Sequence, residues 1–128
     1  MTCLLDTHCF LWAILNDPRL SAQVGQILGD GRNQLLLSVA SVWEIIVKVE
    51  IGRLPLPRPA ADFMMRRIVK SGIRVLPIRL EHALRLEGLP MHHRDPFDRM
   101  LVAQALEEGV PILSADAALR AYGAEIIW

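Results

Sequence analysis

The chain has 128 residues, of which 52% are hydrophobic and 22% are charged, and its formal net charge is +0. This length suffices for one domain, residues 1–128, with a core of its own and no need of a disulfide framework. The neutral charge argues against a nucleic-acid-binding domain that works by excess positive charge alone. The apolar share is above the usual one, and we expect part of it to be buried against a second copy of the chain.

No apolar stretch reaches the roughly 18 unbroken residues of a membrane helix. The longest stretch, residues 35–49, is interrupted by serines, a glutamate and a lysine. The N-terminus lacks the basic start and the cleavage pattern of a secretory signal peptide. We therefore expect a cytoplasmic protein without membrane association, in which Cys3 and Cys9 are reduced and packed as small apolar side chains.

Short apolar segments alternate with helical patterns along the chain. Strands are predicted over residues 3–5, 34–37, 73–78, 111–113 and 124–127. Helices are predicted over residues 9–15, 21–28, 60–70, 81–86, 95–108 and 117–122, and another begins at Ser38 or Ser41 and ends near residue 51. This alternation is typical of an α/β fold with a largely parallel sheet.

Two acidic residues follow predicted strands. Asp6 comes directly after residues 3–5, and Asp116 comes shortly after residues 111–113, with Ser114 between strand and acid. In open α/β sheets, ligands bind outside the carboxyl ends of the strands, so both carboxylates are candidate ligands. A structural role is the alternative, because aspartate is a favoured N-cap and a helix is predicted nearby in each case. Ser114 is a candidate donor to a neighbouring carboxylate or to a metal-held water.

Glu44 lies in a predicted helix that is apolar on most sides. Together with Ser41 and Lys48 it forms one narrow polar stripe at helical spacing. If the stripe faces water, Glu44 only pairs with Lys48 at i, i+4, which contributes a few tenths of a kcal/mol. If the stripe faces a wet cleft, Glu44 is a candidate ligand, and both interpretations stay open. The other sides of this helix leave little room for solvent and carry Val42, Trp43, Ile45, Ile46, Val47 and Val49.

Asp95 and Asp98 begin the longest predicted helix. Asp95 precedes Pro96, which fits an N-cap followed by proline at the first helical position. Asp98 lies in the first turn, where the helix dipole favours an acid. It also heads the apolar stripe of this helix, so we expect its carboxylate at the rim of the core, where an unpaired charge is costly. We predict Asp98 as the ligand and Asp95 as a cap or a neighbour of the site.

A parallel topology would bring Asp6, Glu44, Asp98 and Asp116 to one edge of the sheet. Carboxylates so close together raise each other's pKa unless cations compensate their charge. Oxygen ligands without a cysteine–histidine cluster favour Mg²⁺ or Mn²⁺ over zinc. A water activated by such a cation is the natural nucleophile for phosphodiester hydrolysis. The sequence therefore predicts a divalent-metal site.

Four segments give the sequence a resemblance to a known family in their order and spacing. They are Leu-Asp-Thr-His at residues 5–8, Ser-Val-Trp-Glu-Ile at 41–45, Arg-Asp-Pro-Phe-Asp-Arg-Met-Leu-Val-Ala-Gln-Ala at 94–105, and Leu-Ser-Ala-Asp at 113–116. The set resembles the motifs of PIN-domain ribonucleases, and most of all those of VapC-type toxins. Gly-Arg-Leu-Pro-Leu-Pro at residues 52–57 is also similar to this subgroup.

The resemblance implies a three-layer sandwich and a Mg²⁺- or Mn²⁺-dependent endoribonuclease. It also implies an RNA substrate, a cognate antitoxin encoded beside the gene, and a homodimer. The family's four acids match Asp6, Glu44, Asp98 and Asp116. Around them, Ser114 matches a position that is usually serine or threonine, and Thr7 and Asp95 are expected to support the ligands.

Basic residues lie within and just before the third segment and on the middle helix. Arg94 and Arg99 are candidates for contacts to RNA phosphate, since a guanidinium matches phosphate geometry; ordinary surface ion pairs are the alternative. His92 and His93 could lie near the metal, but histidines in such a loop are more often simply solvated. A small basic cluster on the middle helix is a weak signal for phosphate contacts and consists of Arg66, Arg67 and Lys70.

Two rival functions fit parts of the pattern. A phosphoacceptor signalling domain also places an aspartate at a strand end, but it would want an acidic pair before the first such strand and a late lysine, and no lysine follows Lys70. The second rival is a non-catalytic α/β binding module in which all the acids are helix caps. It predicts no stabilisation by metal, whereas a ligand of the folded state raises the melting temperature.

Overall fold

The computed structural model describes residues 1–128 and is built on a sheet whose five strands are all parallel. The strands are β1 (Thr2–Leu5), β2 (Gln34–Ser38), β3 (Arg74–Leu76), β4 (Ile112–Leu113) and β5 (Ile126–Ile127). Their order across the sheet is β3-β2-β1-β4-β5. The chain thus adds β2 and β3 on one side of β1, and then adds β4 and β5 on the other side. The point of reversal, between β1 and β4, is where open α/β sheets bind ligands.

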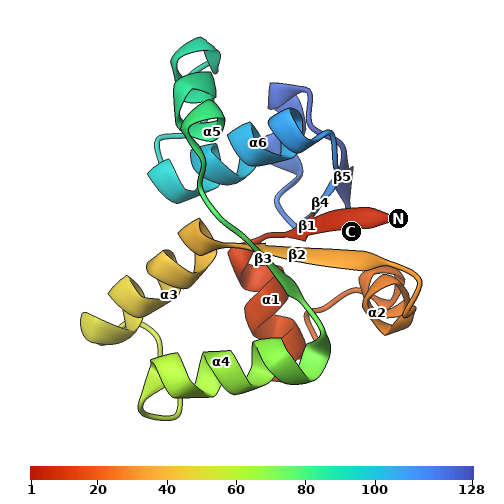
Figure 1. Ribbon diagram of the computed structural model, residues 1–128, viewed down its shortest axis with the longest axis vertical. Coiled ribbons are helices and arrows are strands. Elements are labelled where there is room, and N and C mark those ends of the chain that lie inside the picture. The colour runs from red at the N-terminus through yellow and green to blue at the C-terminus, as the bar shows by residue number, and fades with distance from the viewer.

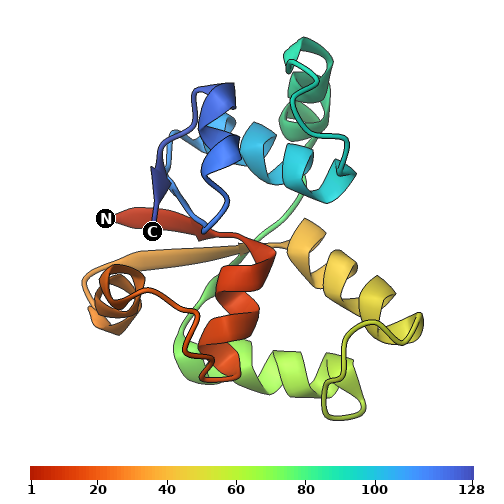
Figure 2. The same cartoon turned by 180° about the vertical axis from the view of Figure 1, so that it is seen from behind.

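Helices cover both faces of the sheet (Figure 1; Figure 2 shows the same from behind). One face carries α1 (Thr7–Ile14), α2 (Ala22–Gly29), α3 (Val39–Glu50) and α4 (Ala60–Ser71). The other carries α5 (Leu80–Arg85), α6 (Pro96–Glu108) and two 3-10 segments, η1 (Leu86–Gly88) and η2 (Ala117–Tyr122). Each face has its own core, of 17 and 12 buried residues. The predicted three-layer α/β sandwich is confirmed.

The strands are apolar on both sides because both faces of the sheet are covered. Cys3 and Leu5 of β1 point into one core and Leu4 between them points into the other. Both cysteines are buried and free, as predicted. No helix has the length and apolar character needed to cross a membrane.

Local signals fix the starts and ends of the helices. Ser38 begins α3: its hydroxyl accepts a hydrogen bond from the Ala40 amide at 3.0 Å, so the choice between Ser38 and Ser41 is settled in favour of Ser38. Gly109 ends α6 in the left-handed conformation at φ 67°, which costs glycine nothing. The helix predicted from residue 9 begins earlier, at Thr7, because Asp6 caps it. The strand predicted over residues 73–78 is shorter, Arg74–Leu76.

Candidate active site

Asp6 stands at the carboxyl end of the central strand. The Asp6 amide donates to the Leu113 carbonyl of β4 at 3.1 Å, which ties the end of β1 to its neighbour. Asp6 Oδ1 accepts the Cys9 amide at 2.7 Å and so caps α1. Its side chain is 7% exposed. Burial raises the pKa of Asp6 and the Glu44 charge adds to this, whereas hydrogen bonds from Ser114 and from the Cys9 amide lower it.

Asp116 follows β4, the neighbour of β1, and lies two residues beyond Ser114, the position that corresponds to Asp6. Leu5 and Leu113 are register partners in the paired strands, so the residues that follow them leave the sheet side by side. The buried Ser114 hydroxyl accepts the Asp116 amide at 3.0 Å. Asp116 Oδ1 in turn accepts the Ala118 amide at 3.0 Å and caps η2. The capping interpretation is thus correct for both strand-end acids, but each cap occupies only one carboxylate oxygen.

Asp98 reaches the same place from the first turn of α6. The cap of this helix is Asp95, whose Oδ1 accepts the amides of Phe97 at 2.8 Å and of Asp98 at 3.3 Å. Burial raises the pKa of Asp98 to about 6, and the charges of Asp95, Glu44 and Asp6 add to this, while His93 opposes it. No hydrogen bond to the Asp98 carboxylate offsets these effects. Asp98 caps no helix, so helix capping does not account for it.

The polar stripe of α3 faces inward, which corrects one interpretation of Glu44. Ser41 and Glu44 are 0% and 3% exposed, whereas Trp43, on a side of the helix expected to leave little room for solvent, is 59% exposed. Glu44 Oε1 accepts the Thr7 hydroxyl at 2.7 Å, and Oε2 pairs with Lys48 Nζ at 2.6 Å. The predicted i, i+4 ion pair between Glu44 and Lys48 is therefore present, and its carboxylate is buried and not on the protein surface. The buried side of α3 carries Ile45 and Val49 beside Ser41 and Glu44, and a second apolar side with Trp43 and Val47 is left exposed.

Three of the predicted acids line one cavity. Asp6, Asp98 and Asp116 share a cleft of about 370 Å³ whose other walls include His8, Trp12, Arg19, Ala115 and Leu119. Glu44 lies behind this cleft, close enough for its charge to raise the pKa of both Asp6 and Asp98. Three of the four acids predicted to converge therefore line one cleft, and Glu44 lies near them without lining it. Thr7 donates a hydrogen bond to Glu44, and Ser114 donates one to Asp6. Asp95 caps the N-terminus of α6.

His93 is the residue whose position the sequence did not define. Its Nε2 lies 3.5 Å from Asp116 Oδ2, and one ligand atom each of His93, Asp98 and Asp116 lie within 4.8 Å of one another. The side chain is 24% exposed, so it is not simply solvated as a loop histidine was expected to be. His92, the neighbouring residue, is exposed. The only sequence signal was the position of His93 five residues before Asp98, which is not specific.

The two arginines of this segment differ in their surroundings. Arg94 is exposed and its side chain makes no hydrogen bond within the protein. Arg99 is turned toward the preceding loop, where it donates to the carbonyls of Pro90 at 2.8 Å, Leu89 at 3.3 Å and Leu86 at 3.4 Å. Arg99 thus fastens the loop to α6. Arg19 lines the acidic cleft. Its guanidinium forms an ion pair with Asp17 and lies over the Trp12 ring.

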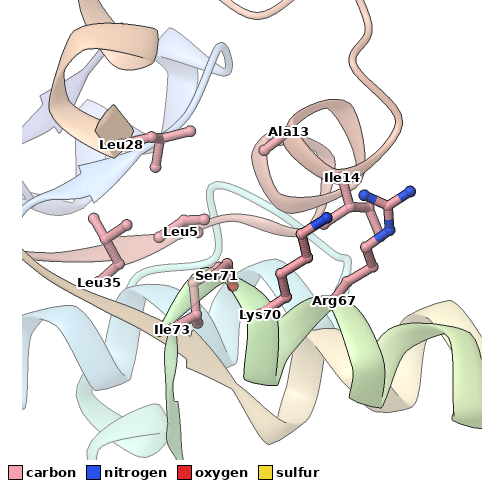
Figure 3. Close-up of a pocket in the computed structure, with 9 residues that line it drawn as sticks. All are labelled: Leu5, Ala13, Ile14, Leu28, Leu35, Arg67, Lys70, Ser71 and Ile73. Atoms are coloured by element: carbon pink, nitrogen blue, oxygen red, sulfur yellow. The ribbon is translucent and has the colours of Figure 1, made fainter. Parts of the chain in front are cut away.

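A second, apolar cavity lies away from the acids. It has about 300 Å³ and is walled by residues of β1, β2, α1, α2 and α4. Figure 3 shows Arg67 and Lys70 extending from α4 with their charged ends beside Ala13 and Ile14 of α1. Two members of the predicted basic cluster therefore border this cavity and not the acidic cleft. Arg66, the third, is also exposed on α4.

The acidic cleft has the character of a cation site. Three carboxylates share it, and one of them, Asp98, has a pKa of about 6 because of burial and like charges. His93 Nε2 is buried at its edge and has no hydrogen-bond partner. Oxygen-rich clusters of this type are the ligands of hard divalent cations, which would remove the repulsion. The residues present therefore fit a divalent metal ion.

Two ribonucleases are similar to this chain in sequence. Ribonuclease VapC22 of Mycobacterium tuberculosis is 27% identical over 122 residues, which are 94% of this chain and 92% of that protein. Ribonuclease VapC16 of the same organism is 39% identical over 70 residues, which are 52% of this chain and only 48% of that protein. The chain thus spans about half the length of VapC16 in that match.

Solved structures share the fold. VapBC2 from Rickettsia felis, bound to a DNA fragment from its promoter, matches with a TM-score of 0.73 at 12% identity over 100% of this chain and 99% of that chain. FitAcB from Neisseria gonorrhoeae gives 0.65 at 17% identity over 98% and 96%. A toxin–antitoxin complex from Klebsiella pneumoniae gives 0.63 at 15% identity over 98% and 96%.

A comparison with protein families agrees with these matches. Residues 3–125 match the PIN domain, which leaves only the outermost residues of the chain outside the match. The match spans β2, β3, β4 and all of β1 except its first residue, and it ends one residue before β5. This chain belongs to the PIN-domain family.

Proposed function

We propose that this protein is a metal-dependent endoribonuclease and the toxin of a toxin–antitoxin pair. The observation that carries the proposal is the meeting of Asp6, Asp98 and Asp116 in one cleft, from three different elements of a PIN-domain chain. Both named relatives are ribonucleases, and the matched structures include toxin–antitoxin complexes. The rival module with capping acids fits Asp6, Asp95 and Asp116 but leaves Asp98 without a role.

In this proposal the carboxylates of Asp6, Asp98 and Asp116 hold Mg²⁺ or Mn²⁺, with Glu44 completing the negative charge. The cation, when bound, supplies an activated water and stabilises the charge that develops on the phosphate. Asp6 and Asp116 each use one oxygen as a cap, which orients the other. Oxygen atoms of carboxylates have two lone pairs each, so Glu44 retains acceptor capacity beside its bonds to Thr7 and Lys48.

The remaining residues of the proposed site orient the ligands or contact the RNA. Thr7 and Lys48 fix Glu44, and Ser114 supports Asp6. Arg94 is exposed and directly follows His93 in the chain, and in this proposal it contacts a phosphate of the RNA. For Arg99 a contact to phosphate requires that its guanidinium keep a donor free beyond the three loop carbonyls it now binds.

Two protein partners belong to the proposal. An exposed apolar stripe runs along α3 at i, i+4 spacing, and it consists of Val39, Trp43, Val47 and Ile51 at 40%, 59%, 37% and 59% exposure. Apolar surface of this kind marks an interface, and we assign it to the homodimer. The cognate antitoxin then docks along residues 55–68, with a basic side chain reaching the acids. Both assemblies form in the cytoplasm.

Cleavage of RNA by the purified protein tests the proposed activity. We expect cleavage with Mg²⁺ or Mn²⁺, none with EDTA, and none from Asp6→Ala or Asp98→Asn. Asp62→Asn is the matched control, because Asp62 is an exposed acid in the first turn of α4, far from the cleft in sequence and packing. Cleavage by Asp98→Asn at the wild-type rate would refute the assignment. Copurification with the product of the adjacent gene tests the antitoxin.

A further inference from the structure

We propose that His93 is a direct ligand of the cation through Nε2, and that this nitrogen makes the site prefer Mn²⁺ over Mg²⁺. The inference rests on the proposed function, since it concerns the same cation. It adds a fifth side chain from a loop that carries none of the four acids. It also assigns the metal, which the carboxylates alone leave open.

The first observation is that His93 Nε2 faces the acids without forming a hydrogen bond to any of them. His93 Nε2 is buried and makes no hydrogen bond. Its distance of 3.5 Å to Asp116 Oδ2 is longer than the N–H···O bonds of proteins. Buried polar groups are almost always satisfied, so an exception calls for a partner that occupies the space in front of it. That space is bordered by Asp98 and Asp116.

The second observation is that His93 contacts Tyr122 through both its backbone amide and its ring. The His93 amide donates to the Tyr122 hydroxyl at 2.6 Å, and the two rings stack at 6.1 Å with an angle of 21° between their planes. Tyr122 is 8% exposed and ends η2, the segment that Asp116 caps. One short segment therefore contacts the backbone and ring of His93 and also carries Asp116 as its cap.

The third observation is the spacing of the donor atoms. One atom each of His93, Asp98 and Asp116 lie within 4.8 Å of one another. Ligands bonded at about 2.1 Å to one ion are at most about 4.2 Å apart, so a small contraction suffices to bring all three onto one cation. Mg²⁺ prefers oxygen ligands, whereas imidazole favours transition-metal ions. Mn²⁺ accepts both donor types, and the mixed set therefore favours Mn²⁺.

Electron paramagnetic resonance of bound Mn²⁺ tests the bond itself. We expect pulsed spectra of the wild-type protein to show a nitrogen coupling that is lost in His93→Gln and kept in His92→Gln and His8→Gln. His92 contacts the same Tyr122 ring edge-on, and His8 lines the cleft, so these variants are matched controls. Histidine labelled with the heavy nitrogen isotope changes the coupling without any substitution, which keeps the test valid if His93→Gln fails to fold.

Metal titrations followed by thermal shift test the preference. His93→Gln is expected to raise the Kd for Mn²⁺ about tenfold, the equivalent of about 1.4 kcal/mol, and to change the Kd for Mg²⁺ much less. Equal loss for both ions would overturn the preference for Mn²⁺, and a nitrogen coupling that survives His93→Gln would overturn His93 as a ligand. Either result would leave the cation site intact. A wild-type protein that binds neither ion would instead overturn the proposed function.

Discussion

Replacing Asp98 with asparagine should remove metal binding and yet stabilise the metal-free protein. The pKa of Asp98 is raised from its ordinary value of 3.8 to about 6 by burial and like charges. The unfolded chain therefore loses this proton at lower pH than the folded protein does, and stability falls as pH rises from about 4 to about 6. Above that window the whole penalty of the buried charge is present.

The size of the effect follows from the same shift. Raising the pKa from 3.8 to about 6 corresponds to about 3 kcal/mol. Asp98 is partly exposed, and solvent screening reduces this to about 1.5 kcal/mol. The charge also interacts favourably with the α6 N-terminus by about 0.5 kcal/mol, which the amide loses. Asp98→Asn should therefore gain about 1 kcal/mol in metal-free buffer at neutral pH.

Urea unfolding in EDTA at about pH 4 and at about pH 8 measures this difference. We expect Asp98→Asn to exceed the wild type at the higher pH and to lose the advantage at the lower one. Adding Mn²⁺ should reverse the order, because only the wild type gains from binding. Asp62→Asn, at an exposed position of α4, should follow the wild type throughout. A variant that is less stable than the wild type in EDTA at both pH values would refute the reasoning.

Three further substitutions test the parts around the acids. Thr7→Val removes the hydrogen bond to Glu44 and should cost about 1 to 2 kcal/mol in urea unfolding, with no loss expected for Thr7→Ser. Lys48→Met leaves the buried Glu44 carboxylate without its cation, so the melting temperature should fall and Mn²⁺ should restore part of it; an undiminished deficit in Mn²⁺ would contradict this. Asp95→Ala removes the cap of α6 and should cost about 1 kcal/mol, checked by urea unfolding with Asp95→Asn as the milder control.

Much of this protein was determined by the sequence alone. Apolar strands that alternate with helices require a parallel sheet covered on both faces, and this fold has it. Asp6 directly follows β1, and Asp116 comes shortly after β4. Parallel strands end at a common edge of the sheet. Their meeting therefore needed no knowledge of side-chain packing. Asp98 could be assigned the inward position because the apolar stripe of α6 continues from it.

The tertiary structure decided what depends on contacts between elements. The helical period of α3 defined a polar stripe but not its direction, and only packing against α1 brings Thr7 to Glu44 and turns Trp43 outward. His93 lies in a loop without periodicity, and its place at the cleft is set by Tyr122, a residue far along the chain. The pKa of Asp98 is likewise a sum of burial and neighbouring charges, which exists only once the chain has folded.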